Sequence, residues 1–251
     1  MMEKTSAIQV FDRLQAVVGK KMEYVINTQS ETLNEVAIQM DQVIRNDGII
    51  HLFGSGHSHL IAEDCLYRAG CFAPANPILP EEVIIGCGAV MATRKEREHG
   101  LAERVFHQYC VSKNDMMIVI SNSGINDVPI EMAQLSKDHG ILVACITSMA
   151  HSKRAETRSA SHKKLYQICD YSIDNGCDYG DASIELESGV RVAPVSTIMG
   201  SFILQGLFAS VAEIMLRRGE KPPVYDSANI TDGAENNQQL IDRYIGRVKH
   251  L

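Results

Sequence analysis

The chain has 251 residues, of which 45% are hydrophobic and 22% charged, a balance that is typical of a globular protein with a full core. The formal net charge is −7 and there is no long basic run, which argues against a nucleic-acid partner, because such a partner needs a clustered positive face. Apolar runs such as residues 116–120 and 141–146 are strand-sized, so we predict no membrane span.

The amino end and the cysteines favour a cytoplasmic protein. Lys4 and Asp12 place charges in what would be the apolar core of a signal peptide, so we do not expect export. Seven cysteines are present and none belongs to a C-x-x-C pair. An odd number of cysteines without metal-ligand spacing fits reduced, mostly buried thiols.

The first 46 residues are predicted to be helical. Helical periodicity runs over residues 4–46 and stops at Asn46-Asp47-Gly48. Thr28, followed three residues later by Glu31, resembles a capping box, which predicts that this stretch is divided into two helices.

A strand, a tight loop and a helix then follow one another, and this unit recurs along the chain. Short apolar runs predict strands at 49–53, 116–120, 141–146 and 171–173. A helical pattern follows each of the first three strands. The first pattern runs through Arg68, the second covers 128–139 and the third begins after Ser148. Apolar runs that alternate with helices predict parallel strands joined by right-handed crossovers, which defines an α/β fold. We predict a further strand near 83–85, within a proline-containing stretch at 74–92.

The last part of the chain contains the most hydrophobic helix. It is predicted over 196–218, packed in the interior or at a subunit interface, and Pro222-Pro223 ends it. A short helix is predicted over 238–248. Because no linker rich in Pro, Gly or Ser divides the chain, we predict one domain over 1–251, with a helical extension at 1–46, an α/β core at 47–220 and a tail at 221–251.

Glycine and hydroxyl residues gather where the predicted strands end. These segments are Gly54-Ser55-Gly56-His57-Ser58, Ser121-Asn122-Ser123-Gly124-Ile125-Asn126 and Thr147-Ser148. Open parallel sheets bind ligands outside the carboxyl ends of their strands, and backbone N–H groups with short hydroxyls are the donors that a phosphate needs. One such loop alone is usually a turn with a helix cap, whereas two on successive strand ends favour a shared anion site. For Thr147 and Ser148 both a cap and a ligand contact stay open.

Two nucleotide-binding motifs are absent from the sequence. There is no G-x-x-x-x-G-K-[ST], and Gly54-Ser55-Gly56 continues with His57, Ser58 and His59, which breaks the G-x-G-x-x-G pattern. We therefore expect no nucleotide cofactor. His57 and His59 lack a third ligand nearby in the sequence, so we expect no metal site either.

The order of these elements and loops resembles the sugar isomerase (SIS) domain family, and within it the phosphoheptose-isomerase-like proteins. The resemblance covers roughly residues 30–220 and is most specific in the serine-rich second loop. It implies a flavodoxin-like three-layer sandwich with about five parallel strands. It also implies a homodimer or homotetramer that binds a phosphorylated sugar near subunit interfaces.

The resemblance assigns the phosphate to the two loops. It implies that the phosphate is surrounded by Ser55, Ser58, Ser121, Ser123 and Asn126 and that Ser196 or Thr197 adds to the sugar site. Asn126 stands where Ser or Thr is more often found, and its amide can still donate a hydrogen bond.

The catalytic residues of the family have no counterpart at the matching positions. Phosphoheptose isomerases resemble this chain but carry a glutamate about ten residues beyond the first-loop serine, where Arg68 lies here. They also use a histidine on the late helix, and this chain has none between His162 and His250. The remaining candidates for proton transfer are Asp64, Glu63, His57 and Glu213.

Each candidate has a structural alternative. Glu63 and Asp64 are also typical of solvated acids in the first half of a helix. Glu213 can pair with Arg217 one turn later, and Arg68 can either bind a phosphate or form an ion pair. The charged run at 94–99 is predicted to be a solvated helix face.

The sequence thus predicts a phosphosugar-binding protein with two possible functions. The first is an aldose–ketose isomerase or an enzyme of related enolising chemistry. The second is a non-catalytic phosphosugar sensor or regulatory module, which fits intact anion loops with displaced catalytic residues. No helix-turn-helix with a basic recognition face precedes the core, which counts against a self-contained transcription regulator.

Overall fold

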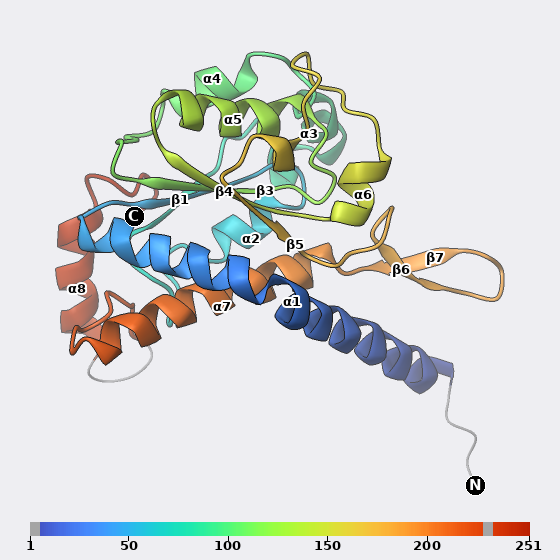
Figure 1. Ribbon diagram of the computed structural model, residues 1–251, viewed down its shortest axis with the longest axis horizontal. Helices are drawn as coiled ribbons and strands as arrows, with labels where there is room; N and C mark the ends of the chain where they lie inside the picture. The colour runs from blue at the N-terminus through green and yellow to red at the C-terminus, as the bar shows by residue number, and fades with distance from the viewer. Residues whose placement is uncertain (1–5, 228–232) are drawn as a thin grey trace, which may run out of the picture.

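Five parallel strands form the central sheet of the protein (Figure 1). The computed structural model describes residues 6–227 and 233–251. The strands lie in the order β2-β1-β3-β4-β5, and every neighbouring pair is parallel. Their bounds are β1 (Ile50–Gly54), β2 (Ala75–Ile78), β3 (Met116–Ile120), β4 (Leu142–Thr147) and β5 (Tyr171–Asp174). This is the strand order of flavodoxin-like folds, so the predicted fold class is confirmed.

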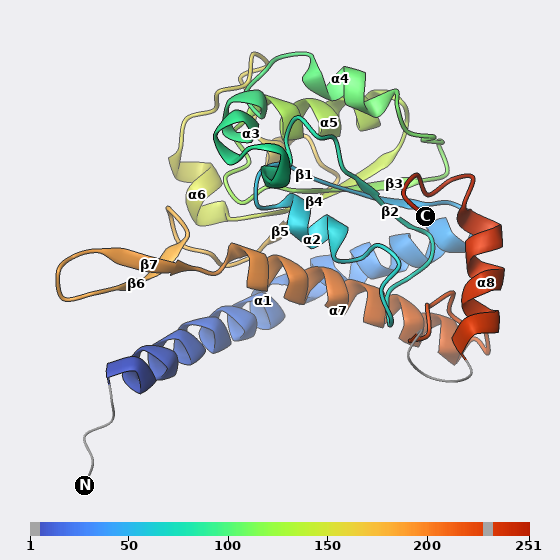
Figure 2. The same cartoon turned by 180° about the vertical axis from the view of Figure 1, so that it is seen from behind.

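Helices cover both faces of the sheet and give three layers (Figures 1 and 2). One face carries α1 (Ser6–Arg45), α2 (His59–Glu63) and α7 (Ser196–Arg217). The opposite face carries α4 (Leu101–Phe106) and α5 (Asp127–Asp138). At the carboxyl edge of the sheet lie α3 (Ala89–Lys95) and α6 (Met149–Arg154) (Figure 1).

The two cores follow from the alternation of side chains along each strand. In β3, Met116, Ile118 and Ile120 belong to the core shared with α1 and α7. Met117 and Val119 point the other way, into the core shared with α4 and α5. All five residues are buried, so this strand is apolar on both faces, as the central strand of a covered parallel sheet must be.

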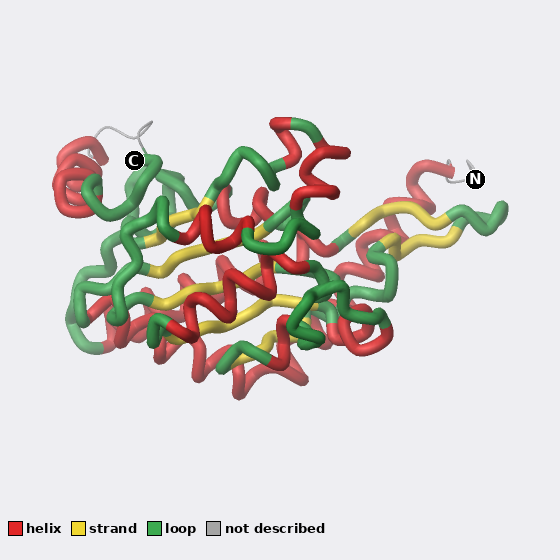
Figure 3. Tube along the Cα trace, turned by 90° about the horizontal axis from the view of Figure 1, so that it is seen from above, coloured by secondary structure: helices red, strands yellow, loops and turns green. Residues whose placement is uncertain are grey.

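The amino-terminal region forms one continuous helix, so the predicted division at Thr28 is wrong. α1 has 40 residues, and the Thr28 hydroxyl donates to the Tyr24 carbonyl at 2.8 Å. This bond to the residue four positions earlier is the one that a threonine makes inside a helix, where it leaves the helix intact. The first half of α1 projects from the body beside the hairpin of β6 (Ala182–Glu185) and β7 (Arg191–Pro194), which the sequence analysis did not predict (Figures 1 and 3).

The strand predicted near 83–85 lies elsewhere in the same stretch. The second strand of the sheet is β2, and Ile84 makes only a single bridge, to Gly56, before the short 3-10 turn η1 (Ile85–Cys87). A proline within β2, Pro77, hid the strand from the pattern. It is tolerated because β2 lies at the sheet edge, where one side of the strand needs no N–H donor.

The carboxyl-terminal elements begin close to their predicted positions. α7 is long and apolar enough to cross a membrane, yet Met199, Ile203 and Leu207 are buried in the core beneath the sheet. The last helix, α8 (Gly233–Tyr244), lies about one turn earlier than predicted. A further 3-10 turn, η2 (Leu165–Gln167), precedes β5.

Candidate functional site

The two loops predicted to bind an anion flank the point where the strand order reverses. The chain passes from β1 outward to β2 on one side, and β3 lies on the other side of β1. Gly54 is in register with Ile120, so Ser55 and Ser121 leave neighbouring parallel strands at the same level. The prediction that both loops lie at one edge of the sheet is therefore confirmed. In such sheets this switch point is where ligands bind.

The first loop is shaped by two glycines. A Cβ atom on Gly54 would lie 2.5 Å from the Ser58 carbonyl carbon, so no other residue fits at the end of β1. Gly56 has a φ of 57°, and its N–H donates to the Val83 carbonyl at 2.8 Å. The loop turns back tightly, leaving Ser55 buried and His57 exposed. The regular helix that follows, α2, ends at Glu63, earlier than the predicted Arg68.

The second loop is packed equally closely. Gly124 has a φ of 61°, and a Cβ atom there would lie 2.5 Å from the Ser152 hydroxyl oxygen. The Gly124 N–H donates to the Ser121 hydroxyl at 3.2 Å. Asn126 is the N-cap residue of α5, but its side chain does not cap the helix. That amide is therefore free to bind something else.

The carboxylate of Glu96 joins the two loops. The Ser55 hydroxyl donates to Glu96 Oε2 at 3.0 Å, and Asn126 Nδ2 donates to Glu96 Oε1 at 2.9 Å. Arg158 Nη1 in turn donates to Asn126 Oδ1 at 2.8 Å. Burial raises the pKa of Glu96 above its usual value. Donors from both loops thus converge on the two oxygens of one carboxylate.

Glu96 corrects the prediction for the charged run at 94–99. Glu98 does behave as a solvated residue and pairs with Lys95 and Arg104. Glu96, by contrast, turns inward from the end of α3, and its carbonyl also accepts a hydrogen bond from the Val128 N–H at 3.1 Å. Charge alternation could not distinguish these two glutamates, because only the tertiary fold brings Ser55 and Asn126 next to one of them.

Two hydroxyls of the predicted site have no hydrogen-bond partner among the residues that the structure describes. Ser58 and Ser123 are partly exposed, and their side chains make no hydrogen bond to any part of the chain that the structure describes. The Ser123 carbonyl, in contrast, accepts a bond from the Ser152 hydroxyl at 2.6 Å. Asn122 is held by Asn175, which donates to Asn122 Oδ1 at 2.9 Å. Ser58 and Ser123 are thus free to donate to a ligand.

The hydroxyls that follow β4 are engaged within the fold. The Thr147 hydroxyl lies 3.1 Å from that of Ser152, and Ser148 donates to the Cys177 carbonyl at 2.6 Å. Ser148 also accepts from the His151 N–H at 3.1 Å and so caps α6. Both residues are fully buried. Of the two interpretations of this pair, the cap describes the geometry of Ser148.

The start of α7 is held by a residue that the sequence analysis did not consider. Asp181 accepts from the Val195 and Ser196 N–H groups and from the Ser196 hydroxyl, the last at 2.6 Å. Ser196 therefore has a protein partner. Thr197 beside it is partly exposed.

The predicted proton-transfer candidates do not form one cluster. Asp64 forms an ion pair with Arg68, which is the structural alternative for that arginine. Glu213 is exposed and accepts from Arg217 at 2.9 Å, four turns or more beyond the start of α7. Glu63 is more than half exposed and lies 3.5 Å from the buried His59.

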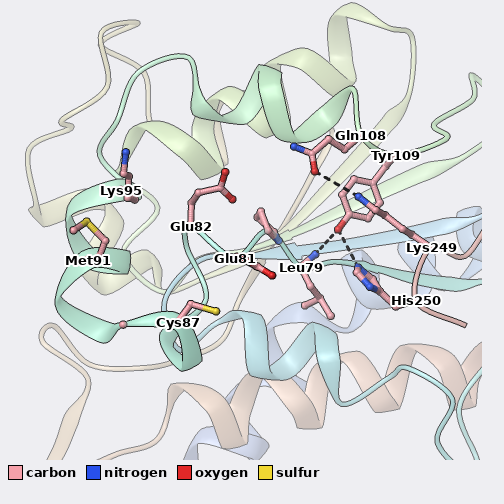
Figure 4. A pocket seen from close by; sticks show the side chains of 12 residues that line it. Leu79, Glu81, Glu82, Cys87, Met91, Lys95, Gln108, Tyr109, Lys249 and His250 are labelled. Carbon is pink, nitrogen blue, oxygen red and sulfur yellow. Dashed lines mark hydrogen bonds between the residues drawn. The ribbon is translucent and has the colours of Figure 1, made fainter.

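A cavity of about 610 Å³ lies at the carboxyl end of β2 (Figure 4). Two residues that line the cavity are next in sequence to residues that form hydrogen bonds with the first loop. Lys95 precedes Glu96, which binds Ser55, and Glu82 precedes Val83, which binds the Gly56 N–H. The cavity therefore adjoins the switch point on the β2 side.

The carboxyl-terminal tail supplies the far wall of this cavity. The Lys249 N–H donates to Asn76 Oδ1 at 3.2 Å, which fixes the tail against β2. His250 Nε2 lies 3.1 Å from the Tyr109 hydroxyl, which also accepts from the Leu79 N–H (Figure 4). Burial lowers the pKa of His250 and raises that of Tyr109. Nothing in the sequence spacing pointed to this pair.

One group of side chains has the composition of a metal site. Ligand atoms of His99, Asp127 and Glu131 lie within 4.8 Å of one another. Both oxygens of Glu131 already accept from the Gly100 N–H at 3.0 Å, and Asp127 accepts from the Ala160 N–H at 3.2 Å. These bonds account for the positions of the two carboxylates without an ion.

Comparison with known proteins defines the class. The family model described as SIS domain matches residues 15–148, which is more than half of the chain, so the protein belongs to the SIS domain family. Within it, the chain is similar to the UPF0309 proteins. It is 37% identical over 231 residues to one from Listeria innocua, covering 92% of this chain and 94% of the relative. It is 35% identical over 235 residues to one from Geobacillus kaustophilus, covering 93% and 94%.

Solved structures share the fold at low identity. The phosphoheptose isomerase GmhA from Neisseria gonorrhoeae aligns with a TM-score of 0.54 and 13% identity, covering 83% of this chain and all of that one. The Vibrio vulnificus NanR protein complexed with ManNAc-6P aligns with a TM-score of 0.52 and 13% identity, covering 94% and 69%. The resemblance inferred from the loops is thus confirmed at the level of family and fold.

Proposed function

We propose that the protein binds a phosphorylated sugar, with the phosphate at the switch point between β1 and β3. The observation that carries this proposal is the convergence of Ser55 and Asn126 on the Glu96 carboxylate. Two donors from separate loops that already bind one pair of anionic oxygens have the spacing and chemistry to bind a phosphate. In this proposal the phosphate of the sugar displaces the Glu96 carboxylate and accepts the hydrogen bonds of Ser55 and Asn126.

The remaining phosphate donors come from the same loops. Ser58 and Ser123 offer hydroxyls without partners, and Ser121 already orients the Gly124 N–H. Backbone N–H groups of His57 and Asn122 complete the donor set, whereas the Gly56 N–H is already bonded to the Val83 carbonyl. The hydroxyls of Thr147, Ser148 and Ser196 have protein partners and therefore mainly stabilise the fold. Of the two residues at the start of α7, Thr197 is better placed than Ser196 to reach a sugar.

Two neighbours of similar fold make a sugar phosphate the preferred ligand class. One is named as a phosphoheptose isomerase, and the other was solved with ManNAc-6P. The cavity beside the first loop has room for the sugar, and its lining of Lys95, Glu82, Tyr109 and His250 suits a polyhydroxylated ligand.

An isomerase is the first of two candidate activities. Aldose–ketose isomerisation needs a base near the carbon next to the carbonyl, and a carboxylate of raised pKa is suited to that role. Glu96 is such a group and lies at the proposed phosphate site. Asp64 and Glu213 are weaker candidates because each is already bound to an arginine.

A sensor or regulatory module is the second candidate. It is favoured by the same contact, because a carboxylate that occupies the phosphate donors is also what a switchable binding site requires. Glu96→Gln separates the two activities. In an isomerase, turnover falls by about 10²–10⁴-fold while binding persists. In a sensor, no turnover is found, and phosphosugar affinity rises because the competing charge is gone.

The test of binding is a calorimetric screen of hexose, heptose and amino-sugar phosphates, each with its unphosphorylated sugar as control. We expect at least one phosphate ester to bind and Ser55→Ala to weaken it by about 1.5–3 kcal/mol. Ser210→Ala is the matched control, because this exposed serine bonds only to the Gly206 carbonyl of its own helix. If no phosphate ester binds, or if both variants weaken binding equally, the proposal is wrong.

A homodimer or homotetramer in the cytoplasm remains our expectation. The projecting half of α1 exposes Phe11, and Ile26 and Ile38 are exposed further along the same helix. Apolar side chains on a projecting helix are typical of a subunit interface. All seven cysteines are free, as in a reducing compartment. Sedimentation at micromolar concentration tests the assembly, and a monomer would contradict it.

A further inference from the structure

Two buried thiols meet beneath the segment that follows α2. Cys65 and Cys71 are 1% and 2% exposed. Gln205 of α7 approaches both of them, with its Nε2 at 3.8 Å from Cys65 Sγ and 3.7 Å from Cys71 Sγ. Both sulfur atoms therefore lie beside the same amide nitrogen, although five residues lie between the two cysteines in the chain.

Cys71 is also open to a small molecule from one side. It lines a cavity of about 700 Å³ together with Arg68, Gln205 and Phe202. The neighbouring Cys65 thiol, the Gln205 amide and the Arg68 charge lower the pKa of the Cys71 thiol. Because Cys71 lines this cavity and Cys65 does not, Cys71 is the thiol that a small oxidant reaches first.

The other cysteines lack this combination. Cys87 and Cys110 are exposed. Burial raises the pKa of Cys177 to about 12. Cys145 and Cys169 are also neighbours and Lys137 lies near them, but the Cys145 thiol and burial raise the pKa of Cys169 well above its usual value, and neither cysteine lines either cavity. Among the described cysteines that line the cavities above, only Cys71 has both a thiol neighbour and a nearby cation.

We propose that Cys65 and Cys71 are a site of oxidation by peroxide, ending in a disulfide between them. The Cys71 thiolate attacks one peroxide oxygen, the O–O bond breaks, and the departing hydroxide takes up a proton to become water. This leaves a sulfenic acid on Cys71. The Cys65 sulfur then attacks the Cys71 sulfur, the S–O bond breaks, and the Cys65 proton leaves with the hydroxyl as a second water. Two thiols are oxidised by two electrons, and one peroxide is reduced to two waters.

The segment that carries both cysteines follows the proposed phosphate loop along the chain, and the oxidation does not depend on ligand binding. Cys65 follows α2, which itself follows the loop of Ser55 to Ser58. A disulfide to Cys71 would close a short ring around Arg68, whose charge faces the cavity. The modification would therefore fix the segment that connects the first loop to β2.

Hydrogen peroxide on the folded full-length protein, followed by alkylation and peptide mass spectrometry, tests the proposal. Trypsin cleaves after Arg68, so a disulfide links the peptides 46–68 and 69–94. The second peptide also contains Cys87, and fragmentation of the linked pair assigns the bond to Cys71 or to Cys87. We expect this linked pair to form at least about tenfold faster than oxidation of Cys87 or Cys110. Cys65→Ser should instead trap a sulfenic acid on Cys71 that dimedone labels.

Several results would overturn the site. The proposal is wrong if exposed Cys87 and Cys110 oxidise first while Cys65 and Cys71 remain alkylatable after unfolding. It is also wrong if Cys71→Ser leaves the oxidation rate of Cys65 unchanged. Should either serine variant fail to fold by circular dichroism, the comparison among the seven thiols of the unaltered protein still decides.

Discussion

The loops after β3 and β4 look alike in sequence but use their hydroxyls in different ways. After β3, the Ser123 hydroxyl has no partner within the described residues, and Asn126 turns its amide toward Glu96. After β4, Thr147 and Ser148 are fully buried and bonded to the protein itself. A hydroxyl at a strand end is therefore informative only once its own hydrogen bonds are known. A hydroxyl that is already hydrogen-bonded within the protein stabilises the fold, and a hydroxyl without such a bond is available to a ligand.

The largest expected effect comes from a change at the point where the loops after β3 and β4 pack against each other. Gly124→Ala places a Cβ atom 2.5 Å from the Ser152 hydroxyl oxygen and 2.9 Å from that of Thr147, at a φ of 61°. We expect a loss of about 3 kcal/mol in the free energy of unfolding, from overpacking and backbone strain together. Urea denaturation measures it. Gly206→Ala is the control, because nothing lies within 4 Å of its Cβ position in α7, and it should gain up to about 1 kcal/mol. Equal effects would show that the two loops are not packed as described.

Ser123→Ala should change binding and spare stability. Its hydroxyl bonds to nothing in the described chain, and the bond from Ser152 goes to its carbonyl, which alanine retains. We expect phosphosugar affinity to fall by about 1.5–3 kcal/mol, the range for a hydrogen bond to a charged group. The free energy of unfolding should stay within about 0.5 kcal/mol. Titration calorimetry with inorganic phosphate as competitor checks the site. An unchanged affinity would remove Ser123 from it.

Ser148→Ala should do the reverse. The change removes the cap of α6 and leaves the Cys177 carbonyl without its donor. We expect a loss of about 2 kcal/mol in the free energy of unfolding. Phosphosugar affinity should remain within about twofold, since this hydroxyl is turned into the protein. A selective loss of affinity in a stable variant would instead place Ser148 in the ligand site.

The fold could be predicted because its signals are local. Strand-sized apolar runs that alternate with amphipathic helices fix the layers, and β1, β3, β4 and β5 begin and end within a few residues of the predicted strands. Two of the failures arose where one residue type is compatible with two different local structures. In the sequence, Thr28 resembles a helix N-cap, but its hydroxyl bonds to the Tyr24 carbonyl inside α1. Pro77 resembles a strand-breaking residue, but it lies in the edge strand β2.

The candidate site could be predicted only in part. Loop composition located Ser55 and Asn126, because glycine and hydroxyl residues after a strand are a local pattern. Glu96 and Arg158 could not be found in this way, since each reaches the site from a distant segment. His250 arrives through the tail, held by Asn76 across the sheet edge. Partners that are set by tertiary contacts leave no trace in sequence spacing.

The smallest expected effect uses two glutamates of the same charged run. Burial raises the folded-state pKa of Glu96, whereas the hydrogen bonds from Lys95 and Arg104 lower that of Glu98. A raised acid pKa stabilises the fold below the unfolded pKa, and this stabilisation is lost as the pH rises through the folded pKa. A lowered acid pKa has the opposite effect and stabilises the fold above the unfolded pKa.

The two glutamine variants should therefore diverge from the unaltered protein in opposite directions. As the pH rises from 4 to 8, Glu96→Gln should become more stable relative to the unaltered protein, because the buried charge is gone. Glu98→Gln should become less stable, by a smaller amount, because its ion pairs are exposed to solvent. Urea denaturation across this pH range measures both. If both variants shifted in the same direction, Glu96 would be one more solvated acid, and the carboxylate that unites the two loops would lose its role as a stand-in for phosphate.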